Sequence, residues 1–320
     1  MLSEHRVRWL VGIGTALAVA FLSACMAVAR LARGNPEWRV LEESPAEYGL
    51  VAVRVGFRSC DDLDVAGWWL TDDASDQPGR ATVVLVHGLG GNRSSMLPIA
   101  RFLVDAGYDV LAIDLRAHGD SEGNYPSPGY LEVAEVTAAV DDAHRRSPSP
   151  VILLGHSVGG VAVLHTAGRG VDVAAAIADS AFVSSFDMMD RVRTSQTSRG
   201  ARLGLWFVSS RGLAGLIAFM IRVGGGQSID ARRSDLVPVL PRIHCPVLFV
   251  TGNRDDIAPT ANTRQMAAAV TVPGTRVAEL QAGHQTHGDA PREYERAVLA
   301  FLDEAALTGE SPGVQPSRAG

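Results

Sequence analysis

The stretch Val151-Ile152-Leu153-Leu154-Gly155-His156-Ser157-Val158-Gly159-Gly160 decides the fold. Four apolar residues that favour a strand run directly into the pattern G-x-S-x-G, and small residues that tolerate a helix follow. This order predicts a strand, a sharp turn and a helix, with a serine hydroxyl exposed on a strained backbone. Glycines at 155 and 159 fit, because strand and helix pass so close to the turn that a Cβ would collide. We therefore interpret Ser157 as a nucleophile rather than a buried turn serine.

Two downstream loops supply the partners that such a serine needs. A serine hydroxyl is a weak nucleophile until a base takes its proton and an acid orients that base. Asp255 and Asp256 follow the predicted strand 247–251, and His284 follows the short predicted strand 276–280. Both loops lie beyond the carboxyl ends of strands, where open parallel sheets place their sites. We expect His284 to be the base, with His287, one turn further on, as the alternative.

A third loop is expected to bind the oxygen of a tetrahedral intermediate. The apolar run 82–86 ends in His87-Gly88-Leu89-Gly90-Gly91-Asn92, and a glycine-rich loop allows backbone N–H groups to point inward. We assign the oxyanion hole to the backbone N–H groups of Leu89 and of Val158, the residue after the nucleophile. His87 and His118 lie in glycine-rich loops, and we expect them to hydrogen-bond the backbone.

With these residues in place, the chain resembles the α/β-hydrolase superfamily over roughly residues 50 to 306. The resemblance rests on five blocks in the expected order: His87-Gly88, residues 114–123, Gly155-x-Ser157-x-Gly159, Gly252-x-x-Asp255 followed by Pro259, and Ala282-Gly283-His284. It is closest to members related to serine aminopeptidases and dipeptidyl-peptidase-like hydrolases. The superfamily spacing selects Asp255 as the acid over Asp256, and Asp179 holds an alternative acid position used by some relatives. Because this frame carries esterases, lipases, thioesterases and peptidases, the motifs predict a reaction class and not a substrate.

The remaining pattern predicts an α/β fold. Residues 51–57 and 63–70 resemble an antiparallel pair at a sheet edge, and strands alternating with helical segments follow. This alternation predicts a mostly parallel sheet with helices on both faces. The pattern breaks between 181 and 242, where we expect a mainly helical cap over the active site.

Composition limits the partners of the chain. With 320 residues, of which 47% are hydrophobic, it can bury one large core. A formal net charge of −6 without any block of lysine and arginine argues against nucleic acid as a partner. The three cysteines, Cys25, Cys60 and Cys245, match neither a metal site nor a disulfide framework. We expect the protein to use no metal and no cofactor.

The N-terminal segment predicts attachment to a membrane. Residues 9–29 carry no charge, and arginines flank them on both sides. At about 1.5 Å per residue a helix here is roughly 30 Å long, which matches a bilayer core. The apolar regions of cleaved secretory peptides have only about 7 to 15 residues, so an uncleaved transmembrane anchor is favoured. The alternative is a lipoprotein, because Leu22-Ser23-Ala24-Cys25 resembles a bacterial lipobox with Cys25 as the acylated residue.

The predicted organisation is therefore an anchor at 1–34, a linker at 35–49, an α/β-hydrolase domain at 50–306 and a disordered tail at 307–320. We expect a single-pass membrane protein whose catalytic domain lies outside the cytoplasm. The predicted activity is cleavage of an ester, thioester or amide in a small-molecule or lipid-like acyl substrate, through an acyl-enzyme. The alternative is an inactive, hydrolase-like binding module anchored to a membrane.

Overall fold

The computed structural model describes residues 4–71, 78–196, 210–223 and 229–307. Its centre is an eight-stranded sheet with the strand order β1-β2-β4-β3-β5-β6-β7-β8. The strands are β1 (Val51–Arg58), β2 (Asp64–Thr71), β3 (Thr82–Val86), β4 (Asp109–Ile113), β5 (Val151–His156), β6 (Ala175–Asp179), β7 (Val247–Gly252) and β8 (Arg276–Leu280). The helices of the body are α2 (Leu97–Asp105), α3 (Val133–Arg146), α4 (Val158–Ala167), α8 (Thr260–Ala269), α9 (Thr286–Asp289) and α10 (Pro291–Leu307).

The strand directions confirm the predicted α/β fold. Strands β4, β3, β5, β6, β7 and β8 pair in parallel, whereas β1 and β2 are antiparallel at one edge. Strand β5, which leads into Ser157, lies between β3 and β6, so the loops after these three strands meet at one edge of the sheet. This arrangement is the one in which open α/β sheets carry their sites.

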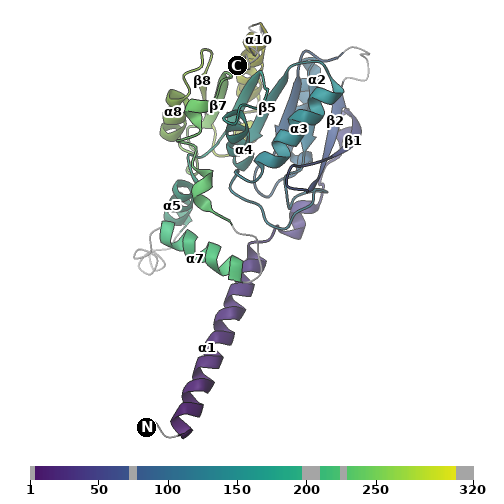
Figure 1. Cartoon of the computed structure of the whole chain (residues 1–320). Coiled ribbons are helices and arrows are strands. Elements are labelled where there is room, and N and C mark those ends of the chain that lie inside the picture. Colours follow the sequence, from purple (N-terminus) through teal and green to yellow (C-terminus); the bar gives the residue numbers. More distant parts are fainter. Residues whose placement is uncertain (1–3, 72–77, 197–209, 224–228, 308–320) are drawn as a thin grey trace, which may run out of the picture.

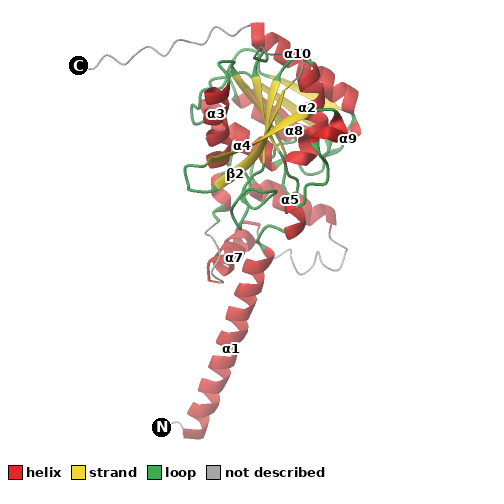
Figure 2. Cartoon of the chain, turned by 90° about the vertical axis from the view of Figure 1, so that its right-hand side faces the viewer, coloured by secondary structure: helices red, strands yellow, loops and turns green. Residues whose placement is uncertain are grey.

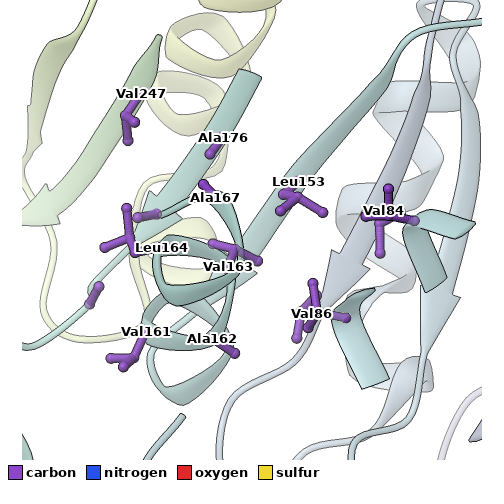
Figure 3. Packing of buried hydrophobic residues seen from close by; sticks show 14 of the residues in the cluster. Val84, Val86, Leu153, Val161, Ala162, Val163, Leu164, Ala167, Ala176 and Val247 are labelled. Carbon is purple, nitrogen blue, oxygen red and sulfur yellow. The ribbon is translucent and has the colours of Figure 1, made fainter. Parts of the chain in front are cut away.

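Helices cover both faces of the sheet because successive residues of a strand point to opposite faces (Figures 1 and 2). In β3, Val84 and Val86 join a buried cluster with side chains of α3, α4 and α8, whereas Val83 and Leu85 join a second cluster with side chains of α2 and α10. Figure 3 shows α4 packed on the first of these faces, next to Leu153 of β5. Strands that are buried on both faces explain the continuous apolar runs in the sequence.

The described part of the insertion at 181–242 is mainly helical. It contains α5 (Ser185–Gln196) and α7 (Ser210–Val223), followed by two short 3-10 helices at Ala231–Ser234 and Leu240–Arg242. The apolar run Leu203–Val208 lies outside the described residues. The helical character that we expected for this region is confirmed where the structure describes it, and its role as a cap stays a prediction.

The N-terminal helix α1 (Glu4–Leu31) projects from the body, and α7 lies beside it in both views (Figures 1 and 2). Within the residues that the structure describes, no helix has the length and apolar character needed to cross a membrane. The predicted transmembrane helix over residues 9–29 is therefore not supported. Part of this helix packs on protein, since α1 contacts α7 and the side chains of Cys25 and Ala29 are buried.

The segment that we predicted as a linker is folded. Residues 35–49 form two 3-10 helices, Pro36–Arg39 and Pro45–Tyr48, and the first lies against loops of the hydrolase body. Most of the predicted tail, residues 308–320, lies outside the described residues.

Candidate active site

Ser157 lies at the sharp turn between β5 and α4. Its backbone has φ 53° and ψ −115°, a strained conformation for a residue with a Cβ. The turn is held because the Ser157 N–H donates to the carbonyl of Asp179 at the end of β6, at 2.8 Å. It also needs glycine, because a Cβ built at Gly159 would lie 2.3 Å from the carbonyl oxygen of Val86. The predicted strand–turn–helix around the serine is confirmed.

The structure brings Ser157, His284 and Asp255 together from three separate loops. The Oγ of Ser157 lies 3.0 Å from Nε2 of His284, and Nδ1 of the same imidazole lies 2.8 Å from Oδ2 of Asp255. A proton on Nδ1 bonds to the carboxylate and leaves Nε2 as an acceptor for the serine hydroxyl. The arrangement can therefore take a proton from Ser157 while the acid fixes the tautomer.

The Asp255 carboxylate is built to remain charged. Its side chain is fully buried, and its second oxygen, Oδ1, accepts the backbone N–H groups of Ile257 at 2.8 Å and Ala258 at 2.9 Å. Burial alone would raise the pKa of Asp255, but the hydrogen bonds from His284 and from these N–H groups outweigh it and lower that pKa. The neighbouring Asp256 is exposed.

The alternative base and the alternative acid have other partners. His287 packs its ring against Phe102 and Tyr294, with centroids 6.2 and 5.3 Å away. Asp179 accepts hydrogen bonds from Nδ1 of His156 at 2.9 Å and from the hydroxyl of Thr286 at 2.6 Å. The imidazole of His284 instead bonds Ser157 through one nitrogen and Asp255 through the other.

Asp179 nevertheless connects the two halves of this site, which the sequence did not reveal. His156 precedes Ser157 and Thr286 lies two residues after His284, so one buried carboxylate ties both loops together. Burial would lower the pKa of His156, but the Asp179 carboxylate outweighs it and raises that pKa. In the sequence, the only sign of this role was that a predicted strand ends in a polar residue, Asp179. That this strand lies beside β5 is known only from the strand order.

The loop at 87–92 passes directly beside Ser157, since a Cβ built at Gly88 would lie 3.3 Å from the Cβ of Ser157. His87 is buried, and burial lowers its pKa to about 4, so its ring is neutral. Its Nδ1 lies 2.7 Å from the Gly88 carbonyl, and its Nε2 accepts the N–H of Leu115 at 3.0 Å. Because the Gly88 carbonyl and the Leu89 N–H belong to one peptide unit, this hydrogen bond fixes the direction of the Leu89 N–H.

The Val158 N–H is the second expected donor, and it lies in the first turn of α4. N–H groups there have no partner inside the helix and lie at the positive end of the helix dipole. The two predicted donors thus come from the loop after β3 and from the first residue of α4.

Comparison with known proteins places the chain in a family. The profile of the Alpha/beta hydrolase family matches residues 83–297, and the chain belongs to this family. A protein of Salmonella typhimurium called YfhR is 26% identical over 280 residues, which cover 84% of this chain and 86% of that protein. The sn-1-specific diacylglycerol lipase ABHD11 of Mus musculus is also 26% identical, over 69% of this chain and 80% of the lipase.

Among solved structures, the Pyrococcus furiosus esterase Pf2001 is similar, with a TM-score of 0.68 and 24% identity, over 85% of this chain and 98% of the esterase. The family match confirms the superfamily resemblance found from the motifs, whereas the peptidase-like branch stays a prediction. The protein is an alpha/beta hydrolase.

Proposed function

We propose that the protein is a serine hydrolase that cleaves an ester, thioester or amide through an acyl-enzyme intermediate. The observation that carries the proposal is the continuous pair of hydrogen bonds from Ser157 through His284 to Asp255, at 3.0 and 2.8 Å. A lipid-like or small-molecule acyl compound is the proposed substrate, in line with the esterase and the lipase among the similar proteins.

In the first half of the reaction, Nε2 of His284 takes the hydroxyl proton as Oγ of Ser157 attacks the substrate carbonyl carbon. The carbonyl oxygen becomes an oxyanion, which the backbone N–H groups of Leu89 and Val158 stabilise. His284 then gives its proton to the leaving group, and an acyl group remains on Ser157. Asp255 stays ionised throughout and holds the proton of the imidazole on Nδ1.

In the second half, water replaces the leaving group. His284 accepts a proton from the water as its oxygen attacks the acyl carbon, and the N–H groups of Leu89 and Val158 again stabilise the oxyanion. Collapse of this second intermediate breaks the bond to Ser157, whose Oγ takes the proton back from His284. The products are a carboxylic acid and the free enzyme.

A fluorophosphonate probe tests this proposal. We expect the wild-type protein to be labelled and to turn over p-nitrophenyl butyrate, and Ser157→Ala to lose both while its thermal midpoint stays nearly unchanged. The hydroxyl lies at a partly exposed turn and adds little to packing, whereas losing a nucleophile costs several orders of magnitude. A wild-type protein that folds but takes up no label would instead be the inactive binding module.

We also propose that the protein is attached to a membrane through its N-terminal region, with the hydrolase domain outside the cytoplasm. Exposed apolar side chains on α1 support the attachment, among them Leu17, Val19 and Phe21. The ring of Phe21 lies 6.4 Å from that of Phe219 on α7, which is also exposed, so the apolar surface continues onto this helix. Surfaces of this kind mark sites of contact with lipid or protein.

Fractionation of cells tests the attachment. We expect the full chain to be in the membrane fraction and to need detergent for release, and a chain beginning at Asn35 to be soluble. If the full chain stays soluble, the proposal is wrong. Cys25→Ala separates the lipoprotein from an anchor without lipid, because only the lipoprotein loses its membrane attachment with this substitution.

A further inference from the structure

The segment that follows α1 lies against the loop that carries the proposed oxyanion donor. We call residues 34–40 the strap. The side-chain amide of Asn92, the last residue of the 87–92 loop, donates to the carbonyls of Trp38 at 3.2 Å and Val40 at 2.8 Å. The Trp38 carbonyl also accepts the N–H of Gly119 at 3.0 Å. The strap lies outside residues 83–297, the range of the family match.

Arg39 also anchors the strap, through the loop after β4. Its guanidinium donates to three backbone carbonyls of the loop after β4, those of Gly119 at 3.3 Å, Ser121 at 2.8 Å and Gly123 at 2.8 Å. Several donors of one guanidinium directed at one loop hold a backbone in a fixed geometry. The Trp38 ring is therefore presented from an anchored stretch of chain.

The Trp38 ring backs a buried histidine that bonds the 87–92 loop. The rings of Trp38 and His118 are stacked, with centroids 4.9 Å apart and planes 6° from parallel. Nε2 of His118 accepts the N–H of Gly90 at 3.1 Å, and its Nδ1 lies 2.8 Å from the carbonyl of Arg116. Burial, with a smaller contribution from His87, lowers the pKa of His118 to about 4, so the ring is neutral and its Nε2 can accept.

The two histidines fix two consecutive peptide units of the loop. The His87 ring bonds the Gly88 carbonyl and so holds the peptide unit between Gly88 and Leu89. The His118 ring accepts the Gly90 N–H and so holds the unit between Leu89 and Gly90. Gly90 has φ +83°, and the Gly91 N–H donates back to Gly88, so the loop is a tight turn centred on Leu89 and Gly90. The Leu89 N–H belongs to the first of these peptide units. The second unit forms the Gly90 end of the same turn, so losing its bond to His118 would release the turn that orients the Leu89 N–H.

We propose that Trp38 is a positioning residue for the oxyanion hole: by stacking on His118 it holds the 87–92 loop in the conformation that directs the Leu89 N–H at the substrate. This inference rests on the proposed serine hydrolase function. A Cβ built at Gly90 would lie 3.4 Å from Nε1 of Trp38, so the indole lies next to the turn as well as on the histidine. The residues that join α1 to the body are thus part of the active-site structure.

The test uses three full-length variants. Trp38→Leu keeps an apolar side chain but removes the ring face, Trp38→Phe restores a ring, and Trp69→Leu removes a comparably half-buried indole on β2 as a control. Active sites are counted by titration with a fluorophosphonate, and kcat and KM for p-nitrophenyl butyrate are expressed per titrated site. Inhibition by an aryl trifluoromethyl ketone, which forms a tetrahedral adduct with the serine, measures the oxyanion hole directly.

We expect Trp38→Leu to lower kcat about tenfold with KM changed less than about twofold, because loss of a whole oxyanion donor costs about 10² to 10³ and misalignment costs less. The ketone should bind about tenfold more weakly, and Trp38→Phe should recover most of both losses. Trp69→Leu should lower the thermal midpoint but leave kcat per site unchanged.

If Trp38→Leu keeps kcat and ketone affinity per site within about twofold of wild type, or if Trp69→Leu loses as much, the inference is wrong. In either case a wild-type protein that labels and turns over still supports the proposed function. A wild-type protein that takes up no label overturns the inference and the proposed function together.

Discussion

Replacing Asp255 with asparagine tests two properties of the proposed site, the charge of the carboxylate and the proton on Nδ1 of His284. The substitution keeps the shape of the side chain, so the packing of this buried position is preserved. In the native site Oδ1 accepts two backbone N–H groups, from Ile257 and Ala258, and Oδ2 faces Nδ1 of His284. The side-chain amide of the Asp255→Asn variant therefore has only one favourable orientation, with its oxygen toward the two N–H groups.

That orientation turns the amide NH₂ group toward His284. Nδ1 of the imidazole must then accept a hydrogen bond, which moves its proton to Nε2, the atom that has to take the proton of Ser157. Flipping the amide would place its NH₂ group against the two backbone N–H groups. It would lose two hydrogen bonds of about 1 kcal/mol each and would leave buried donors unpaired, which costs further free energy. We expect kcat/KM to fall roughly 10³- to 10⁴-fold, which is about 4 to 5.5 kcal/mol of transition-state stabilisation.

The assay is hydrolysis of p-nitrophenyl butyrate at pH 8, with the concentration of folded protein checked by circular dichroism. Asp256→Asn is the matched control, because it removes the same charge from the adjacent, exposed position and should change kcat/KM less than about twofold. If Asp255→Asn keeps more than a tenth of the wild-type value, or if the two variants exchange their effects, Asp255 is not the acid.

Asp179→Asn should lower kcat/KM about tenfold, because it weakens the hydrogen bonds that join His156 and Thr286 but leaves the imidazole of His284 with its partners. This loss should be smaller than that of Asp255→Asn, and an equal loss would contradict the ranking. Acid should destabilise the fold through His87 and His118, whose pKa of about 4 in the folded protein lies below the value of about 6.5 expected when unfolded. Their contribution is complete above pH 6.5 and is lost as the pH falls toward 4, at about 2 kcal/mol for each histidine at pH 5. Urea unfolding at pH 8 and pH 5 measures it, and a His118→Gln variant that loses as much free energy as wild type between these values would refute it.

The sequence by itself determined the sheet and the three loops that meet at its edge. Strand 151–155 and the turn at Ser157 could be predicted because a strained elbow admits few residue types, and those types are local in sequence. The predicted strands agree with the observed ones within two residues at their ends. The central strands were the easiest to predict, because strands buried on both faces leave an uninterrupted apolar run. The order of Ser157, Asp255 and His284 along the chain, with the motifs around them, predicted the family, and the family match confirms it.

The tertiary structure alone decided which polar residues share an environment. Asp179 could be recognised in the sequence as an alternative acid position. Its bonds to His156 and Thr286, however, depend on β6 lying between β5 and β7, an order that no local pattern encodes. Trp38 lies in a stretch that has the composition of a linker, and it contacts His118, 80 residues away, because the loop after β4 packs against the strap. Periodicity reports which face of an element is buried, whereas hydrogen bonds and ring stacks between distant loops arise when the elements pack, so they follow from the assembled fold.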